Sequence, residues 1–435
     1  TPTPLPTPTP LPPLAPTVQQ RGTDTVLVSW TAPTGPQPVA DYDYRYRPYI
    51  HTAYWIEVTD TEQTATQVEI DRLMPGATYE VQVRAANQGG VGEWSSSGRA
   101  QTLPPPTPTP IPGGQLLIFS DPGPGDEVTS LQNAVARTIL EYGYGYQTHS
   151  IRGTEMESIR NLGNRITNVH MGVRLPRYES VLAEAERGGS LLRLTASIDG
   201  VSSRSAFLIP RYTKTANPGL NSVEDLRRPE SQRVFATANS DGRAVLITCI
   251  VAWDCERINE KQVYGYELEQ WVQLEVQHNP ETLYNRIRSA FENQQDILFY
   301  YWWPSALITE VIEQFGGYYQ LTEPAWGQSC WDRLTSAVSA ANITQACGYQ
   351  STSTIKVVRN EVQQEAPEVF EFLKKWKLSE AGVRDLLGTK ARFRFFLLNE
   401  LQYREAAFAW LLDSNEWHSW VGPGIADRVV DGIRG

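Results

Sequence analysis

The chain has 435 residues, of which 40% are hydrophobic and 20% are charged, and its formal net charge is −11. This length and composition predict two or three globular domains, because one core rarely grows that large. The acidic balance argues against nucleic acid as a partner, since a phosphate-binding surface needs an excess of positive charge. It also disfavours an anionic membrane surface, and the apolar stretches fall far short of the ~20 residues that span a bilayer.

Two Thr/Pro-rich segments, residues 1–13 and 104–114, divide the N-terminal part of the chain. Such repeats cannot build a core and favour an extended polyproline II conformation. We interpret them as semi-rigid spacers, the first reaching about 40 Å at ~3.1 Å per residue. A spacer in this position is expected where something upstream is fixed to a surface. The simplest such attachment is an N-terminal lipid anchor that lies outside this chain.

Residues 14–103 alternate apolar and polar side chains in short runs separated by Gly, Pro, Asn and Asp. This pattern predicts an antiparallel β-sandwich. Trp30 stands on an early strand, and the sequence LMPGATY over residues 73–79 has the form of a tyrosine corner. On these features the segment resembles a fibronectin type III domain. Its aromatic side chains are expected in the sandwich core or on strand faces.

From residue 115 onward the predicted strands and helices alternate, which is typical of a doubly wound α/β sheet. Residues 116–119 form a short apolar strand, and a turn that ends at Asp126 precedes a helix predicted over 127–142, which stops at Gly143. Further buried strands and one late helix are predicted at 207–209, 234–236, 297–301 and from Pro367.

The four cysteines all lie between residues 249 and 347, at separations of six and seventeen within the nearest pairs. No Cys-x-x-Cys or His-x-x-x-His spacing accompanies them, so two disulfides are favoured over zinc or free thiols. We predict the pairs Cys249 with Cys255 and Cys330 with Cys347. The second pair closes the longer loop and contributes about 3 kcal/mol in the chain-entropy model. Either pair implies an oxidising compartment.

Several segments in a fixed order carry a further resemblance across residues 115–421. They include the end of the first helix, a crossover strand with the helix start after it, both cysteine pairs, an aromatic box and a late helix, at 141–146, 207–226, 249–255, 300–304, 330–349 and 366–376. In these segments the chain resembles the glycine betaine/proline type substrate-binding proteins of ABC importers. The resemblance implies a two-lobed periplasmic-binding fold of type II, with lobe 1 at about 115–208 and 352–435 and lobe 2 at about 209–351.

In that family, aromatic rings surround the quaternary ammonium of the ligand, and polar groups of the other lobe hold its carboxylate. The resemblance assigns ligand contact to Trp302, with Tyr300, Tyr301 and Trp303 as supporting candidates. Rings suit a cation because their faces are electronegative. Side chains alternate along a strand, so Tyr301 and Trp303 would lie on one side and Trp302 on the other. A place in the core is therefore an equal alternative for Tyr301 and Trp303.

Two positions depart from the family pattern. Arg174 falls where the family has a Trp, and Asp126 falls on or near another family Trp. A guanidinium repels a cation, so Arg174 in the cleft would disfavour glycine betaine and suit a carboxylate or phosphonate. Asp126 in the cleft would bind an ammonium group. The alternatives are that Arg174 is solvated or pairs with a carboxylate, and that Asp126 is only a helix N-cap.

These patterns together predict an extracytoplasmic solute-binding component of an ABC importer, at the cell surface or in the periplasm, whose lobes close over a zwitterionic or quaternary-amine-like solute. Its expected partners are that small molecule and an ABC permease, with no enzymatic activity, metal or cofactor. One alternative is a secreted polysaccharide-active enzyme with a fibronectin accessory module, which needs two carboxylates ~5 to 10 Å apart. The other is a surface sensor or adhesion protein.

Overall fold

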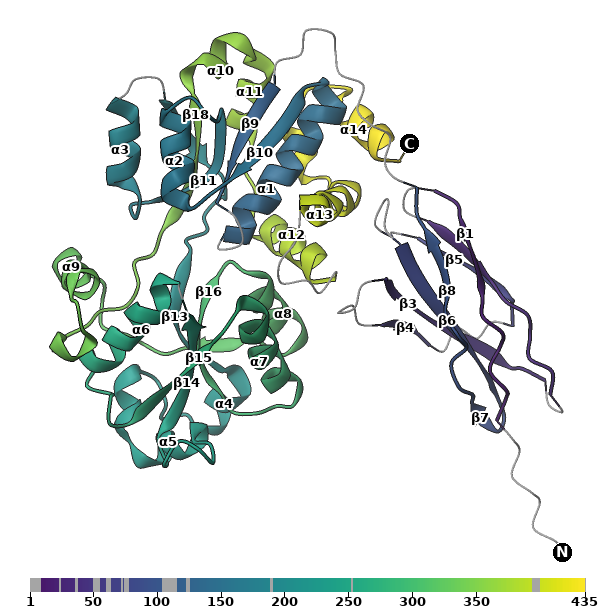
Figure 1. The fold of residues 1–435 in the computed structure, drawn as a ribbon, viewed down its shortest axis with the longest axis horizontal. Helices are drawn as coiled ribbons and strands as arrows, with labels where there is room; N and C mark the ends of the chain where they lie inside the picture. Colours follow the sequence, from purple (N-terminus) through teal and green to yellow (C-terminus); the bar gives the residue numbers. More distant parts are fainter. Residues whose placement is uncertain are drawn as a thin grey trace, which may run out of the picture.

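The computed structural model describes residues 9–434 except for short stretches at 23–24, 36–37, 50–54, 60–63, 72, 74–77, 104–115, 123–125, 188–190, 252 and 393–399. The N-terminal part is a β-sandwich, and the remainder forms two α/β lobes (Figure 1). The predicted combination of an antiparallel sandwich and a two-lobed α/β fold is therefore confirmed. No helix in the described part of the chain has the length and apolar character that a bilayer crossing requires.

The sandwich consists of two antiparallel sheets, as the alternating pattern predicts. One sheet has the order β1-β2-β5, and the other has the order β4-β3-β6-β7 with β8 paired to β6. The core between the sheets is built from inward-facing side chains such as Val28, Tyr42 and Val83. The strands are β1 (Thr17–Gln20), β2 (Val26–Ser29), β3 (Asp41–Pro48), β4 (Ile56–Val58), β5 (Gln67–Ile70), β6 (Thr78–Asn87), β7 (Gly90–Val91) and β8 (Gly98–Gln101).

Arginine side chains cover tryptophan rings on one face of the sandwich. The guanidinium of Arg45 lies 4.6 Å from the ring centroid of Trp55 and 4.4 Å from that of Trp94. Arg47 and Arg84 approach the same two rings at 4.3 Å each. Rings stacked against guanidinium groups are not flat open platforms for sugars. This arrangement agrees with the expectation that the aromatic residues of this module lie on strand faces.

Lobe 1 is a five-stranded mixed sheet of order β10-β9-β11-β18-β12. Its strands are β9 (Leu116–Asp121), β10 (Gln147–Arg152), β11 (Val169–Leu175), β12 (Leu191–Ala196) and β18 (Ser353–Arg359). Its helices are α1 (Glu127–Thr138), α2 (Glu155–Gly163), α3 (Glu179–Arg187), α10 (Asn360–Glu365), α11 (Pro367–Lys375), α12 (Glu380–Arg392), α13 (Glu400–Asp413) and α14 (Ile425–Arg434). The predicted first helix runs slightly further than expected, because a π-helical turn over Ile139–Tyr144 continues α1 to Gly145, which has φ of 78°.

Lobe 2 is a second five-stranded sheet, of order β15-β14-β16-β13-β17. Its strands are β13 (Arg204–Pro210), β14 (Ala244–Ile250), β15 (Val272–Gln277), β16 (Leu298–Trp303) and β17 (Tyr318–Gln320). Its helices are α4 (Arg211–Ala216), α5 (Pro229–Phe235), α6 (Asp254–Gly265), α7 (Pro280–Glu292), α8 (Ala306–Gln314) and α9 (Gln328–Ser336). Strand β14 lies between β15 and β16, runs parallel to both and is buried at every residue.

One predicted strand of lobe 2 is wrong. Residues 234–236 were expected as a buried strand, but α5 extends to Phe235 and only Ala236 forms an isolated bridge, to Ala244. A three-residue apolar run fits a buried helix face as well as a buried strand. The signal for a helix was Pro229, which occupies the first turn of α5, where a missing backbone N–H costs nothing.

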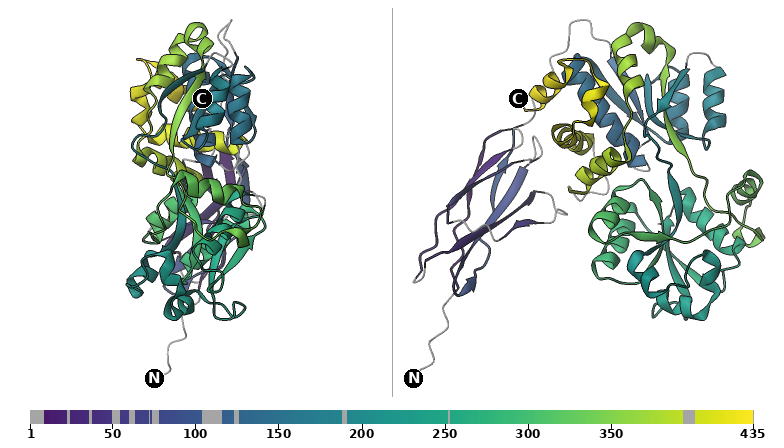
Figure 2. Two further views of the ribbon diagram at one scale, coloured as in Figure 1. Left: turned by 90° about the vertical axis from the view of Figure 1, so that its left-hand side faces the viewer. Right: turned by 180° about the vertical axis from the view of Figure 1, so that it is seen from behind.

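The chain crosses between the lobes twice, and the two crossing segments lie side by side (Figures 1 and 2). Ser203 and Thr352 exchange backbone hydrogen bonds of 2.7 and 3.1 Å at this point. The expected boundary at residue 208 falls inside β13, which belongs to the sheet of lobe 2, so the first crossing ends at about 203. The second expected boundary, at 352, directly precedes β18.

The lobes also touch beside these crossings. Helix α8 of lobe 2 packs on α12 of lobe 1, and Leu307 and Leu386 belong to one continuous apolar core. The carboxylate of Glu127 accepts a hydrogen bond of 2.8 Å from the backbone N–H of Ala306, the first residue of α8. A carboxylate at a helix N-terminus is favourable because the free N–H groups there carry partial positive charge.

Candidate ligand-binding cleft

A cleft of about 330 Å³ lies between the lobes and is lined from both of them. Lobe 1 contributes the N-terminus of α1, the end of β11 and the turn after β11. Lobe 2 contributes β16 and the segments around both cysteine pairs. The side chains used below are Asp126, Thr129, Arg174, Arg177 and Tyr178 from lobe 1, and Trp253, Tyr300, Trp302, Trp331 and Tyr349 from lobe 2.

The wall of lobe 2 is aromatic. The rings of Trp253 and Trp302 meet edge to face with centroids 5.7 Å apart. The ring centroid of Tyr349 lies 5.3 Å from that of Tyr300 and 5.4 Å from that of Trp331. Tyr300 lies 6.4 Å from Trp302, so the five rings form one connected group. Edge-to-face and tilted contacts at these distances are the favourable geometries of aromatic pairs. The wall presents ring faces and edges to a single small volume.

Strand β16 supplies two rings of this wall. Trp302 is partly exposed and lines the cleft together with Tyr300. Tyr301 and Trp303 are 2% and 6% exposed, belong to the core and are not among the residues that line the cleft. The ring of Tyr301 stacks on the indole of Trp302 with centroids 4.2 Å apart. Tyr301 therefore supports Trp302, while Trp303 serves the core, which is the alternative that strand alternation left open.

Both predicted disulfides are present, Cys249–Cys255 and Cys330–Cys347, and they account for all four cysteines. Each one lies directly beside rings of the cleft. Trp253 is inside the short loop that the first disulfide closes. Trp331 follows Cys330, and Tyr349 comes two residues after Cys347. Three of the five rings are thus carried by segments that covalent bonds hold to the body of lobe 2.

The wall of lobe 1 is charged. A terminal nitrogen of the Arg174 guanidinium lies 3.0 Å from the Glu155 carboxylate and 3.7 Å from the Asp126 carboxylate. Asp126 also accepts hydrogen bonds from the backbone N–H and the hydroxyl of Thr129, at 3.2 and 2.9 Å, so it caps α1. For each residue, the two roles considered from the sequence are both present. Arg174 lines the cleft and is also ion-paired. Asp126 lines the cleft and is also the N-cap of α1.

The two carboxylates respond differently to this environment. Burial raises the pKa of Asp126, against the opposing effect of Arg174. Burial would also raise the pKa of Glu155, but Arg174 and His170 together with hydrogen bonds from Arg174 outweigh burial and leave that pKa lowered. Glu155 is therefore the principal counter-ion of Arg174. With Asp126 ionised, one positive and two negative charges give these three groups a formal charge of −1.

Several cleft residues lay beyond sequence reasoning. Trp331 and Tyr349 reach the wall only through tertiary folding, and their one sequence signal was proximity to the second cysteine pair. Arg177 carried no signal at all. Its exposed side chain lines the cleft, and within the described residues its guanidinium forms no ion pair. It lies 5.4 Å from the ring of Tyr178. Of the two arginines among the described residues that line the cleft, Arg174 is ion-paired, so Arg177 is the one available to a ligand.

Family models match two separate parts of the chain. Residues 126–392 match the substrate-binding domain of ABC-type glycine betaine transport systems, and residues 11–101 match the fibronectin type III domain. The first match covers more than half of the chain. The chain belongs to this substrate-binding family. The family, the two-lobed fold and the fibronectin module predicted from the sequence are all confirmed.

Two curated proteins are similar to separate parts of this chain. The glycine betaine/proline betaine-binding periplasmic protein of Salmonella typhimurium is 26% identical over 131 residues, which is 30% of this chain and 38% of that protein. Human protogenin is 33% identical over 108 residues, 24% of this chain and 9% of its own length. The chain thus spans well under two thirds of these relatives.

Two of the solved structures that this chain matches are ligand complexes. An ABC-transporter choline-binding protein in complex with choline has a TM-score of 0.48 at 17% identity, covering 74% of this chain and 99% of that one. Lactococcal OpuAC in its closed form with glycine betaine has a TM-score of 0.46 at 13% identity, covering 74% and 100%.

The Glu155 and Arg174 pair should stabilise lobe 1 in a pH-dependent manner. We expect Glu155→Gln to lower the free energy of unfolding by about 2 to 4 kcal/mol at pH 7, because it leaves a largely buried guanidinium with a weaker partner. The pKa of Glu155 is lowered in the folded state, so its contribution is present above the unfolded value of ~4.3 and is lost as pH falls further. Urea unfolding between pH 3 and 7 measures both effects.

The matched control is Glu179→Gln. Glu179 also pairs with an arginine of lobe 1, Arg193, but its side chain is 48% exposed. An exposed pair contributes at most ~1 kcal/mol, so this variant should change stability little. Equal losses in the two variants, or a Glu155→Gln variant whose difference from the wild type does not shrink at acid pH, would contradict the assignment of Glu155 as the buried counter-ion.

Proposed function

We propose that the chain binds a small quaternary-ammonium zwitterion of the betaine type between its lobes and presents it to an ABC permease outside the cytoplasm. One observation carries the proposal: five aromatic rings of lobe 2 share a cleft with an anionic group of lobe 1. Membership in a family of solute-binding domains, as opposed to enzymes, supports it. The paired cysteines suit an oxidising compartment.

The aromatic wall would hold the ammonium end of the ligand. Each ring face within ~6 Å of a cation contributes about 0.5 to 2 kcal/mol, with Trp the strongest, and three of the five rings are Trp. Quaternary ammonium groups cannot donate strong hydrogen bonds, so rings compete well with water for them. Arg174 does not oppose this binding, because Glu155 and Asp126 compensate its charge.

Arg177 would hold the anionic end of the ligand. Its guanidinium fork fits a carboxylate with two parallel hydrogen bonds. The hydroxyl groups of Ser203 and Thr352 at the crossings between the lobes, and of Ser205 on β13, also line the cleft and would add neutral donors. A ligand that bridges the rings of lobe 2 and Arg177 of lobe 1 binds the closed state better than the open one. Only such differential binding drives closure.

The Thr/Pro-rich spacers would carry the binding lobes away from a membrane to which an upstream lipid anchor attaches the chain. This part of the proposal rests on the sequence of residues 1–13 and 104–114, most of which lie outside the described residues. Extended polyproline segments suit such a role because they resist collapse. The fibronectin module would then act as a further rigid spacer, since its tryptophan rings are occupied by arginine side chains.

A ligand panel with a tryptophan variant tests the proposal. Thermal unfolding and calorimetry should show that glycine betaine binds. The neutral choline isostere 3,3-dimethylbutanol should not bind. A ligand at 100 times its Kd adds about 2.7 kcal/mol of stability. We expect Trp302→Ala to lower the affinity for glycine betaine at least ~tenfold. The substitution removes the indole ring that stacks on Tyr301 and faces the cleft. Trp271→Ala, at an exposed Trp of lobe 2 outside the cleft, is the control.

If Trp302→Ala binds glycine betaine as tightly as the wild type, the proposed site is wrong. The panel also includes choline, proline betaine and proline. If no ligand with an ammonium group binds, the proposed function is wrong. Binding of the neutral isostere as tightly as choline would show that the cleft recognises shape alone.

Arg177→Gln tests how the anionic end is held. We expect this variant to bind glycine betaine about ten- to a hundredfold more weakly, because a charge-assisted bidentate contact contributes ~1.5 to 3 kcal/mol. Choline has no carboxylate, so its affinity should stay the same or rise. Arg187→Gln, on the exposed end of α3, is the charge-matched control. Equal effects of Arg177→Gln on both ligands would contradict a carboxylate contact at this residue.

Removing the first disulfide should weaken ligand binding through Trp253. In a variant with Cys249→Ala and Cys255→Ala, the loop that carries this ring becomes mobile and must be ordered again on binding. Ordering one large side chain costs ~0.5 to 1.5 kcal/mol, so we expect about a two- to tenfold loss of glycine betaine affinity. Calorimetry well below the melting temperature separates this effect from unfolding.

A double-mutant cycle isolates the cause. In a Trp253→Ala background the same cysteine substitutions should cost no further affinity, because the ring they position is absent. A full additional loss in that background would show that the disulfide acts on the cleft by another route.

A further inference from the structure

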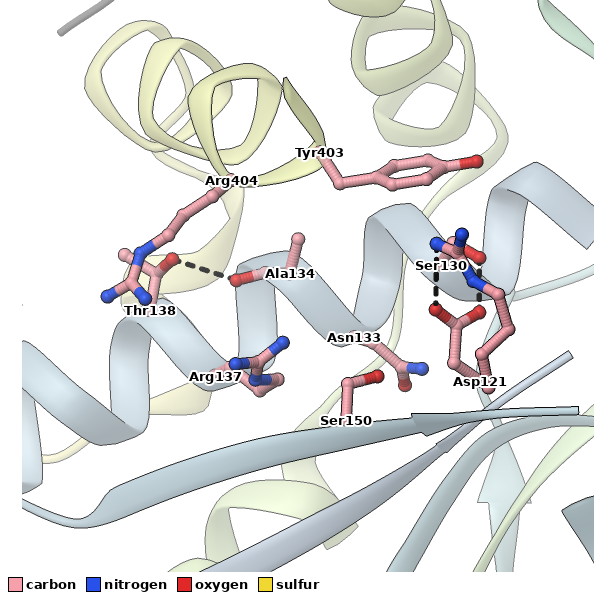
Figure 3. Close-up of a pocket in the computed structure, with 10 residues that line it drawn as sticks. Asp121, Ser130, Asn133, Ala134, Arg137, Thr138, Ser150, Tyr403 and Arg404 are labelled. Atoms are coloured by element: carbon pink, nitrogen blue, oxygen red, sulfur yellow. Dashed lines mark hydrogen bonds and ion pairs between the residues drawn. The ribbon is translucent and has the colours of Figure 1, made fainter. Parts of the chain in front are cut away.

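A second pocket lies within lobe 1 and shares no lining residue with the cleft. It has a volume of about 290 Å³ and lies between α1, strands β9 and β10, and α13 (Figure 3). Its size is close to the lower end of the ~300 to 1,000 Å³ typical of small-molecule sites. The lining side chains come from four elements: Asp121 from β9; Ser130, Asn133, Ala134, Arg137 and Thr138 from α1; Ser150 and Arg152 from β10; and Tyr403 and Arg404 from α13.

Three arginines from three different elements line this pocket, which we name the arginine pocket. Arg152 lies 3.5 Å from Asp121, Arg404 pairs with Glu141, and the Nε–H of Arg137 donates to the hydroxyl of Thr148 at 2.8 Å. Asp121 in turn accepts a hydrogen bond of 2.5 Å from Ser130. Three guanidinium groups against the two carboxylates of Asp121 and Glu141 leave a formal charge of +1. The pocket therefore favours an anion.

A buried acceptor lines the same pocket without a partner among the described residues. Asn133 is 2% exposed, and its side-chain N–H donates a hydrogen bond of 2.8 Å to the backbone carbonyl of Ser120. Its carbonyl oxygen Oδ1 accepts no hydrogen bond from the part of the chain that the structure describes. In Figure 3, Asn133 and Ser150 lie between Arg137 on one side and Asp121 on the other. An unpaired buried acceptor costs about 1 to 3 kcal/mol, which a ligand that donates a hydrogen bond would recover.

We propose that the arginine pocket binds a small organic oxyanion that carries a hydroxyl group, in the manner of a 2-hydroxy acid. The guanidinium groups of Arg137 and Arg152 take the carboxylate oxygens in fork geometry. The ligand hydroxyl donates to Asn133 Oδ1. An ammonium donor fits the position less well, because the surrounding charge is positive. The ring of Tyr403 and the methyl groups of Ala134 and Thr138 supply apolar contact with the carbon skeleton.

The test compares L-malate with succinate, which has the same dicarboxylate skeleton without the hydroxyl. Calorimetry on the full chain should show saturable binding of L-malate at about three- to tenfold higher affinity than succinate, as one neutral hydrogen bond predicts. Arg137→Gln and Arg152→Gln should each weaken L-malate binding at least ~tenfold. Arg152 is 46% exposed, so its variant keeps the test valid even if the other variant loses stability. Arg160→Gln, on the exposed face of α2, is the control.

The Trp302→Ala variant separates the two sites. L-Malate should bind it as it binds the wild type, and saturating glycine betaine should not compete. The proposal is overturned if L-malate gives no saturable signal up to ~10 mM, if Arg137→Gln and Arg152→Gln bind it unchanged, or if Trp302→Ala abolishes its binding. Equal affinity for L-malate and succinate would overturn the assignment of the hydroxyl to Asn133. None of these outcomes depends on whether the cleft binds a betaine.

Discussion

The cleft depends on keeping five large rings ordered at a surface that water can reach. Free apolar rings on a lobe surface would pack against one another or against the nearest core, because burial of each one is favourable. Two rings, Tyr300 and Trp302, are fixed by their strand and by the stacked ring of Tyr301. The other three are carried by segments that the two disulfides close. A wall ordered in advance spares the ligand the entropy of ordering it.

The division of chemistry between the lobes explains why the site needs two of them. Lobe 2 presents five rings and the exposed carboxylate of Asp254, which pairs with Arg257. Lobe 1 presents Arg177 with the compensated group around Arg174. The proposed zwitterion would satisfy both walls only when they approach each other, so most of its binding free energy would be available in the closed state alone. The packed contact of α8 with α12 and the Glu127 hydrogen bond hold one edge of the interface together. Because these contacts hold one edge, rotation about the crossing segments is the simplest motion by which the lobes could close.

Sequence reasoning succeeded where local rules decide and failed where distant segments meet. Alternation along β16 predicted that Trp302 and Trp303 have different surroundings, and cysteine spacing predicted both disulfides. The contribution of Tyr349 depends on a fold that brings the second cysteine pair against β16, which no local pattern encodes. Arg174 was predicted to repel a cation, but its counter-ion Glu155 lies on a separate helix. The charge of a site is a property of all its neighbours, and sequence order does not show them.

Helix α1 connects the cleft and the arginine pocket. Its first turn lines the cleft through Asp126 and Thr129, and its middle turns line the arginine pocket through Asn133 and Arg137. The helix is pressed closely onto β11, because a Cβ at Gly172 would lie 2.0 Å from the Thr129 hydroxyl. A ligand that moved α1 would therefore also move the Asp126 carboxylate relative to Arg174. Any such effect must be reciprocal, since each ligand changes the affinity of the other by the same factor.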